Sequence, residues 1–424
     1  MISSTRETST EYTNPYRPLP VRLFNHIASN GNGFGRIGAD AVIKGAKESA
    51  GFVDFGASDF EDRIQILVSS INAEANLHPL GAFMAGQHLK RLIVTRLKLT
   101  QMRKTDPQRF VFNGPDPVFI SGLQRSGTTK LQRMLAGDPS FRVLSCYEAL
   151  QPIPEDHNGG GWRRWIFNQK DNRILATRVA KAALRYLSPD FNAVHPVGAE
   201  DPEEDCLLFD YDLRSTVFDA LWRVPGYSAW LDRQDQSNML KHYRSILAHL
   251  MYQRPADRWL LKSPQHLDYL HDLLKEFPRA LVILTHRDPA RTVPSFCSMI
   301  AHSRNVFSDK TRPTDVAASW VGRQMKMAAN AVECSRIFGT DRFLHVHYKD
   351  LVEQPESVIR KIYTRLGRDL SDATFENIMN WSRENPQHLH GRHRYRITDF
   401  GMEINAIRDR FGEYMRVFNV EEED

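Results

Sequence analysis

The sequence predicts an α/β protein, in which a central parallel sheet is flanked by helices and preceded by a helical extension. Short apolar runs alternate with segments whose apolar residues recur at helical spacing, the pattern of strands that alternate with helices. The run 280–284 is almost continuously apolar, as expected for a strand covered on both faces. The run 118–121 opens directly into a glycine-rich loop, an arrangement typical of phosphate-binding α/β folds.

The first part of the chain has a different character. Residues 1–20 are polar and rich in proline, so we expect a flexible arm that is extended or poorly ordered. Apolar residues then recur at helical spacing as far as the prolines and glycines of 106–117. We therefore expect a helical N-terminal extension at 21–115 and an α/β domain at 116–424.

Within the α/β domain we expect strands at 118–121, 141–145, 259–261, 280–284 and 343–346. The glycine-rich loop should lead into a helix that ends near Gly137. A second helix is expected at 267–277, where Pro278 stops it, and a third after Pro289. A fourth helix should close at Gly367.

Composition excludes several classes of function. The formal net charge of +5 is too small for a general nucleic-acid binder, but it is compatible with a local pocket for an anionic ligand. No run reaches the roughly 18 apolar residues of a membrane helix, and the N-terminus lacks the apolar run of a secretory signal. The four cysteines form no CxxC pair, so we expect reduced thiols in a cytoplasmic protein. The acidic tail at 421–424 is expected to be solvated.

The loop 122–129 has the spacing of a P-loop but lacks its lysine. A nucleoside triphosphatase has lysine directly after the second glycine, where it reaches the β- and γ-phosphates. Here Thr128 follows Gly127, and Arg125 and Lys130 supply the positive charge. A transferred sulfuryl group carries less charge than a phosphoryl group and has less need of a metal ion. The loop therefore favours sulfuryl transfer, with a P-loop kinase or NTPase and a non-catalytic nucleotide-binding protein as alternatives.

Four ordered segments resemble sulfotransferases that use 3′-phosphoadenylyl sulfate (PAPS). The segment 119–129 resembles their 5′-phosphosulfate loop, and its Arg-Ser-Gly-Thr-Thr form is similar to the bacterial branch and to tyrosylprotein sulfotransferases. The cytosolic animal enzymes usually have lysine at the position of Arg125. The other segments are 261–267, 285–289 with Ser295, and 346–351. The resemblance covers roughly residues 116–418. It implies a P-loop-like sulfotransferase fold, PAPS as co-substrate, 3′-phosphoadenosine 5′-phosphate (PAP) as product, and no required metal.

The resemblance also implies where the nucleotide binds. The residues that would hold the 5′-phosphosulfate are Arg125, Ser126, Gly127, Thr128, Thr129 and Lys130. Arg287 and Ser295 would bind the 3′-phosphate, since Arg287 ends an apolar strand and Ser295 lies about two turns into the next helix. Tyr348, in the fourth segment, is a further expected contact. Arg392 is the nearest match to the family's C-terminal cofactor loop, and a solvated basic loop is the alternative.

The group that deprotonates the acceptor hydroxyl is harder to identify, because a general base is defined by its geometry. The analogy with tyrosylprotein sulfotransferases favours Glu148, which could instead be a carboxylate that stabilises the start of a helix. His266 is the second candidate, and it could instead cap its own helix. His195 and the acidic stretch 200–204 are further candidates, although the acidic stretch is also typical of an ordinary helix start.

The remaining expectations concern charge stabilisation, metals and the acceptor. Arg125 and Lys130 are expected to stabilise the sulfuryl group and the bridging oxygen. We do not expect a metal at His388, His390 and His393, because neighbouring arginines would repel a cation. The acceptor is expected to be a small-molecule hydroxyl, aromatic or lipid-like. Aromatic residues after the second strand fit an apolar pocket and equally an ordinary core. An oligomer is compatible with the sequence.

Overall fold

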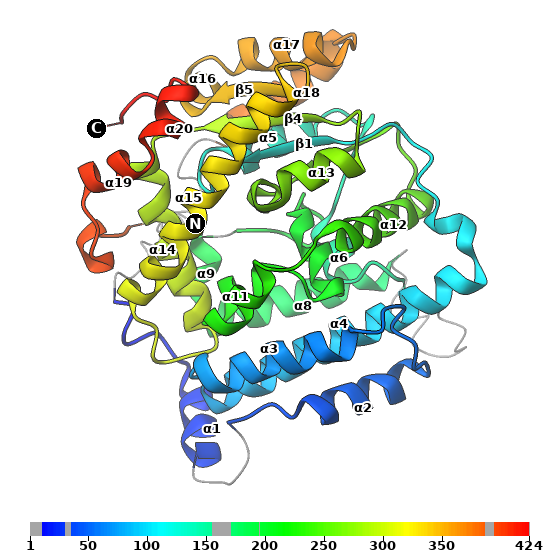
Figure 1. Cartoon of the computed structure of the whole chain (residues 1–424), viewed down its shortest axis with the longest axis vertical. Coiled ribbons are helices and arrows are strands. Elements are labelled where there is room, and N and C mark those ends of the chain that lie inside the picture. Colours follow the sequence, from blue (N-terminus) through cyan, green and yellow to red (C-terminus); the bar gives the residue numbers. More distant parts are fainter. Residues whose placement is uncertain (1–10, 30–34, 155–170, 195, 386–393, 424) are drawn as a thin grey trace.

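The computed structural model describes residues 11–29, 35–154, 171–194, 196–385 and 394–423 (Figure 1). These residues form a parallel five-stranded sheet in the order β2-β3-β1-β4-β5. The strands are β1 (Val118–Gly122), β2 (Phe141–Val143), β3 (Arg258–Lys262), β4 (Leu281–His286) and β5 (Phe343–His347). The predicted α/β fold class is therefore confirmed. Strand β2 is shorter than expected because Ser145 already caps the helix that follows.

The strand order places β1 in the middle of the sheet. It pairs with β3 on one side and with β4 on the other. The chain crosses from β1 to β2 beyond β3, whereas β4 and β5 lie on the opposite side. The loop after β1 thus leaves the sheet where the strand order reverses, which is the usual ligand site of open α/β sheets. Every residue of β1 and β4 is buried, as covered strands require.

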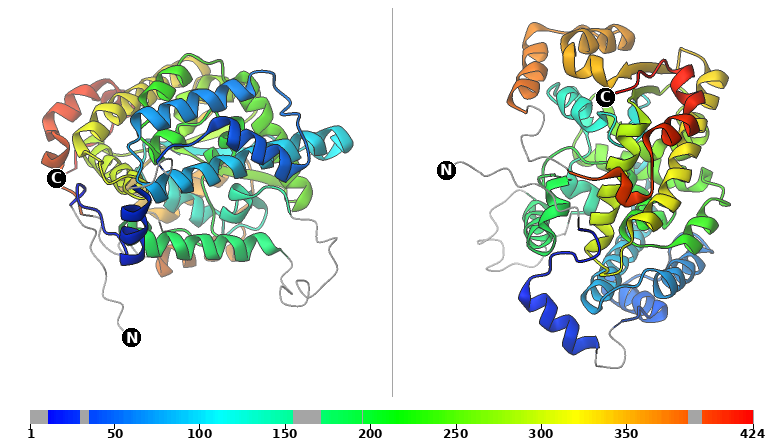
Figure 2. Two further views of the ribbon diagram at one scale, coloured as in Figure 1. Left: turned by 90° about the horizontal axis from the view of Figure 1, so that it is seen from below. Right: turned by 90° about the vertical axis from the view of Figure 1, so that its left-hand side faces the viewer.

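Helices cover the sheet and form a layer at one end of the molecule. The extension consists of α1 (Leu19–Ser29), α2 (Ala39–Ala50), α3 (Phe60–Glu74), α4 (Pro79–Thr105) and the 3-10 turn η1 (Pro107–Phe110). The α/β domain contains α5 (Thr128–Leu135), α6 (Cys146–Leu150), α8 (Asn172–Leu187), α9 (Pro189–Val194), α10 (Val217–Leu221), α11 (Pro225–Leu231), α12 (Ser237–Gln253), α13 (Leu270–Glu276), α14 (Pro289–Asn305), α15 (Pro313–Phe338), α16 (Tyr348–Glu353), α17 (Pro355–Leu366), α18 (Asp372–Glu384), α19 (Ile404–Arg410) and α20 (Gly412–Val417). Its 3-10 turns are η2 (Asp205–Asp212), η3 (Pro264–Tyr269) and η4 (Ile397–Phe400). In Figures 1 and 2 the blue extension lies at the opposite end from the orange α17 and α18. Within the described ranges, every helix is too short or too polar to cross a bilayer.

Two apolar clusters cover the two faces of the sheet. Side chains alternate along β1, so Val118 and Ile120 join the smaller cluster with α5, α17 and α18. Phe119 points to the other face and joins the larger cluster. That cluster also contains Leu67 of α3 and Leu89 of α4. The helical extension therefore shares one continuous core with the sheet.

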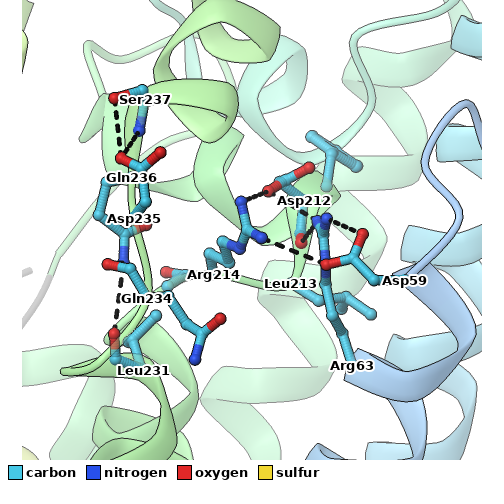
Figure 3. Close-up of polar contacts among 12 residues, drawn as sticks. Asp59, Arg63, Asp212, Leu213, Arg214, Leu231, Gln234, Asp235, Gln236 and Ser237 are labelled. Carbon is cyan, nitrogen blue, oxygen red and sulfur yellow. Dashed lines mark hydrogen bonds and ion pairs between the residues drawn. The ribbon is translucent and has the colours of Figure 1, made fainter.

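A buried ionic cluster joins the extension to the α/β domain (Figure 3). Asp212, at the end of η2, pairs with Arg63 of α3 and with Arg96 of α4, each at 2.9 Å. Arg63 also pairs with Asp59, which Arg214 reaches from the segment after η2. A buried carboxylate is stable only when its charge is compensated. The cluster therefore fixes α3 and α4 against the α/β domain.

The described part of the arm, residues 11–20, is anchored to α14, and its last two residues already belong to α1. Tyr12 is buried, and its hydroxyl lies 2.8 Å from Oγ of Ser298. Arg17 is also buried, and it donates to the backbone carbonyl of Asn305. Burial of one aromatic ring and one guanidinium thus orders a segment whose composition is otherwise that of a flexible arm.

Candidate functional site

The glycine-rich loop between β1 and α5 is shaped by close backbone contacts. Gly122 has a φ of 148°, and a Cβ there would lie 2.4 Å from the carbonyl oxygen of Thr285 in β4. Gly127 has a φ of 97°, and its Cβ would lie 2.9 Å from the ring of Tyr348. Both positions therefore require glycine. Arg125 has a φ of 72°, a conformation unusual for a residue with a side chain and found most often at functional sites.

The loop leads directly into an open helix N-terminus. The buried Ser126 braces the loop: its hydroxyl lies 2.6 Å from both the Leu123 carbonyl oxygen and Oγ1 of Thr285. Among the described residues no side chain caps the start of α5, so the N–H groups of its first turn, at 128–130, can bind an anion. Lys130 lies in this turn, and burial lowers the pKa of its ammonium group. The site therefore combines backbone donors with a cationic side chain.

Four residues expected to bind the nucleotide meet beside this loop. Arg125 donates from Nε to Oγ of Ser295 at 3.3 Å. Arg287 donates from Nη1 to the carbonyl oxygen of Arg125 at 3.4 Å, and its guanidinium lies 3.9 Å from the ring centroid of Tyr348. Within the described part of the chain, Arg125 forms no ion pair with a carboxylate. Its positive charge is therefore available at the loop.

The acidic tail is docked beside the same cluster. Glu421 and Glu422 are 74% and 66% exposed, as expected for a solvated tail, whereas Glu423 is only 34% exposed and departs from that expectation. Glu421 pairs with Lys349 at 3.0 Å, and Glu422 pairs with Arg408 at 2.5 Å. Glu423 pairs with Arg287 at 2.8 Å. The three cations come from separate segments of the chain, so these ion pairs cannot be predicted from the composition of the tail.

Glu148 lies at the start of α6 with both carboxylate oxygens occupied. It is 1% exposed and accepts hydrogen bonds from Arg142 at 2.6 Å and from Arg254 at 3.0 Å. It also accepts from the backbone N–H of Ser145 as part of a capping box. In this arrangement Glu148 has the partners of the structural helix-start carboxylate that the sequence left open as the alternative.

His266 is held in η3 by a carboxylate. Its Nε2 lies 2.8 Å from Oδ2 of Asp205, which also accepts a hydrogen bond from the hydroxyl of Tyr243. The side chain is fully buried against the edge of Phe119. Its Nδ1 has no hydrogen-bond partner among the described residues. The imidazole is therefore oriented through one nitrogen and leaves the other free to accept a proton.

Lys262 is a further candidate site residue, which was not among those expected from the sequence. It ends β3 beside β1, opposite Ile120, and its side chain is only 2% exposed. Its ammonium group lies 2.7 Å from Oε1 of Glu204, in the acidic stretch 200–204. A lysine at the carboxyl end of a buried strand is the signal that could have identified it, because these ends converge on the ligand site.

Some expected residues cannot be placed. Arg392, His195 and the histidine-rich segment 388–393 lie outside the described residues. No hydrogen bond or ion pair in the described part of the chain joins Glu148 or His266 directly to Arg125. The structure thus brings together the residues expected to bind the nucleotide, and it keeps both expected bases in separate buried networks.

Comparison with known proteins identifies relatives of this chain. A model of the sulfotransferase family matches residues 117–372, which is most of the α/β domain. Omega-hydroxy-beta-dihydromenaquinone-9 sulfotransferase Stf3 of Mycobacterium bovis is 24% identical over 265 residues, and so is its counterpart in Mycobacterium tuberculosis. The alignment covers 59% of this chain and 62% of these relatives, so the chain spans less than two thirds of their length.

Two crystal structures have a similar fold over most of the chain. Sulfotransferase STF1 from Mycobacterium tuberculosis H37Rv superimposes with a TM-score of 0.74 and 26% identity, covering 88% of this chain and 98% of STF1. Sulfotransferase STF9 from Mycobacterium avium gives a TM-score of 0.77 and 23% identity, covering 90% and 97% respectively. This coverage exceeds the α/β domain, so the shared fold includes helices of the extension.

Proposed function

This chain belongs to the sulfotransferase family, and on that premise we propose that it transfers the sulfuryl group of PAPS to a hydroxyl group of a small-molecule acceptor and releases PAP. The observation that carries the proposal is the meeting of Arg125, Arg287 and Ser295 beside the open N-terminus of α5. Two guanidinium groups and a row of N–H donors suit a nucleotide that is anionic at both ends. A P-loop kinase is not favoured, because Thr128 stands where its lysine would be.

At the 5′ end, the residues of the loop would stabilise the charge that moves during transfer. The acceptor oxygen forms a bond to sulfur while the bond between sulfur and the 5′-phosphate oxygen breaks. Negative charge then develops on that phosphate oxygen, where the N–H groups of 128–130, Arg125 and Lys130 can neutralise it. Arg125 suits this role because no carboxylate of the described residues competes for its guanidinium.

At the 3′ end, Arg287 and Ser295 would bind the 3′-phosphate. A planar guanidinium and a hydroxyl are both good donors to phosphate oxygens. The ring of Tyr348 supports the guanidinium of Arg287 by a cation–π contact at 3.9 Å. The hydrogen bond between Arg125 and Ser295 links the two ends of the site.

For the general base, we propose His266 ahead of Glu148. The supporting observation is the free Nδ1 of an imidazole oriented by Asp205, an arrangement common in catalytic bases. Both oxygens of Glu148 are occupied by cationic donors. His266 is buried, so it would have to become accessible to the acceptor during the reaction.

For the acceptor, we propose a lipid-like molecule with a terminal or aromatic hydroxyl. The relative Stf3 is named for a hydroxylated menaquinone derivative, which is such a molecule. Incubation with PAPS and a panel of lipid-like alcohols and phenols, followed by mass spectrometry, should detect a product heavier by one sulfuryl group. We also propose a cytoplasmic location, for which the four buried free thiols are suitable.

Binding of PAP is the direct test of the proposed function. We expect PAP to stabilise the folded protein against heat, because a ligand that binds only the native state raises its free energy of unfolding. At about 100 times the dissociation constant, the gain is roughly 2.7 kcal/mol. Differential scanning fluorimetry and calorimetric titration measure it. A correctly folded protein that neither binds PAP nor is stabilised by it would rule the proposal out.

A further inference from the structure

The last described residues of the chain return to the carboxyl end of β4. Glu423 accepts hydrogen bonds there from Nε of Arg287 at 3.0 and 3.1 Å and from Nη2 at 2.8 Å. Both carboxylate oxygens thus face one edge of the guanidinium, which is the two-point geometry of a strong arginine–carboxylate pair. The side chains are partly exposed, at 21% for Arg287 and 34% for Glu423, so solvent can reach the pair.

The backbone of the tail is held independently of this ion pair. The N–H group of Glu423 donates to Oδ2 of Asp288 at 2.9 Å, and its carbonyl oxygen accepts from Nη2 of Arg408 at 2.8 Å. Arg408 in turn pairs with the same oxygen of Asp288 at 2.7 Å. Asp288 is completely buried and also caps α14. These contacts position the Glu423 side chain in front of Arg287.

Glu423 occupies the paired donors Nε and Nη2 of Arg287, which are donors that suit a phosphate as well as a carboxylate. A 3′-phosphate and a carboxylate both accept paired N–H donors from a guanidinium. The guanidinium of Arg287 also lies over the ring of Tyr348, 3.9 Å from its centroid, and Nη1 donates to the carbonyl oxygen of Arg125. Burial lowers the pKa of Arg287, but the hydrogen bonds to Glu423 together with the charges of Tyr348, Glu423 and Tyr395 outweigh burial and raise the pKa overall.

We propose that Glu423 is an intramolecular competitor for the 3′-phosphate site, so that nucleotide binding must displace the end of the tail. This inference rests on the proposed function, because it assigns Arg287 to the 3′-phosphate. The docked tail lowers the apparent affinity for 3′-phosphorylated nucleotides by the fraction of molecules in which Arg287 is engaged. When the tail docks again on Arg287, it also favours the release of PAP, because PAP is the product that keeps the 3′-phosphate.

The test compares Glu423→Gln with Glu421→Gln in the chain 1–424. Glu421 pairs with the exposed Lys349 and, among the described residues, with no other cation, so it is a matched acidic control from the same tail. Calorimetric titration with PAP should show roughly fivefold tighter binding for Glu423→Gln, because the neutral amide competes less well for a partly exposed guanidinium. Glu421→Gln should bind PAP as the wild type does.

Adenosine 5′-monophosphate provides the second arm, since it lacks the 3′-phosphate. Its affinity should be the same in wild type and Glu423→Gln. Deletion of residues 421–424 also removes the carboxylate of Glu423, so it should tighten PAP binding as Glu423→Gln does. If Glu423→Gln and the deletion of 421–424 both bind PAP no more tightly than the wild type, the proposed competition is overturned and the proposed function stands. Absence of PAP binding in every folded variant, wild type included, overturns the proposed function and the competition with it.

Discussion

The two ends of the proposed nucleotide site are formed by different kinds of groups. The 5′ end is mainly backbone, formed by two glycines in left-handed conformations and the uncapped first turn of α5. The 3′ end is mainly side chains: Arg287 directly follows β4, Ser295 lies in α14, and Tyr348 begins α16. Arg125 at the first end has no carboxylate partner in the described residues, whereas Arg287 at the second is paired with Glu423. The cation nearest the proposed chemistry thus lacks a carboxylate partner among the described residues, whereas the cation proposed to hold the 3′-phosphate is paired with Glu423.

The largest effect is expected when the unpaired arginine is removed. Arg125→Ala should lower the turnover of sulfuryl transfer by about 10³-fold, the loss typical of one preorganised donor to a developing negative charge. Arg125→Lys is the matched control, because it carries the same strain from the φ of 72° and keeps a positive charge. It should retain turnover well above Arg125→Ala. Steady-state assays with PAPS measure both, and wild-type turnover in Arg125→Ala would contradict the role of the 5′ end.

The next effect tests whether the site extends to the edge of the sheet at Glu148. Glu148→Gln leaves the buried Arg142 without its charge partner, so the free energy of unfolding should fall by about 3–5 kcal/mol. Urea denaturation measures it, with Glu376→Gln, from an exposed pair with Arg383, as control.

Turnover separates the structural role of Glu148 from a catalytic one. At a temperature where Glu148→Gln is folded, we expect it to keep most of its turnover, while His266→Ala loses turnover and binds PAP normally. A folded Glu148→Gln that binds PAP but is inactive would instead identify Glu148 as the base.

A smaller effect is expected at the 3′ end. Arg287→Ala should weaken PAP binding by about 10- to 100-fold, as expected for hydrogen bonds to a charged group. Binding of adenosine 5′-monophosphate should change little. In the Arg287→Ala background, Glu423→Gln should no longer tighten PAP binding, because the two changes share one interaction. Arg336→Ala, from an exposed pair, is the control. If Arg287→Ala lost the same affinity for PAP and for adenosine 5′-monophosphate, Arg287 would not be specific for the 3′-phosphate, which contradicts the prediction.

The sheet and the phosphate loop could be predicted from the sequence because their signals are local. Each strand is a short apolar run bounded by polar or turn residues, and the observed strands begin within one residue of the expected positions. Gly122 and Gly127 marked the loop because only glycine fits their backbone conformations. The end of α17 at Gly367, in a left-handed conformation, was also local and was confirmed.

The partners of charged side chains could not be predicted, because they come from distant segments. Glu148 had the position of a catalytic carboxylate, but Arg254, which pairs with it, lies 106 residues away. The acidic tail had the composition of a solvated end, yet Arg287 lies 136 residues before Glu423. The position of Lys262 at the end of a strand is visible in the sequence, but its place beside β1 depends on the strand order, which short-range patterns do not encode.

The central position of β1 also has a consequence for the order in which this protein can be assembled. Ser121, at the end of β1, bonds to the carbonyl oxygen of Ser263 across 142 residues, and Ser126 in the loop meets Thr285 across 159. During synthesis the loop therefore leaves the ribosome long before the strands that brace it exist. Bringing residues so far apart in the chain into contact lowers the entropy of the chain before the contacts between them can stabilise the fold. The nascent chain must therefore keep β1 unpaired until β3 and β4 have been synthesised.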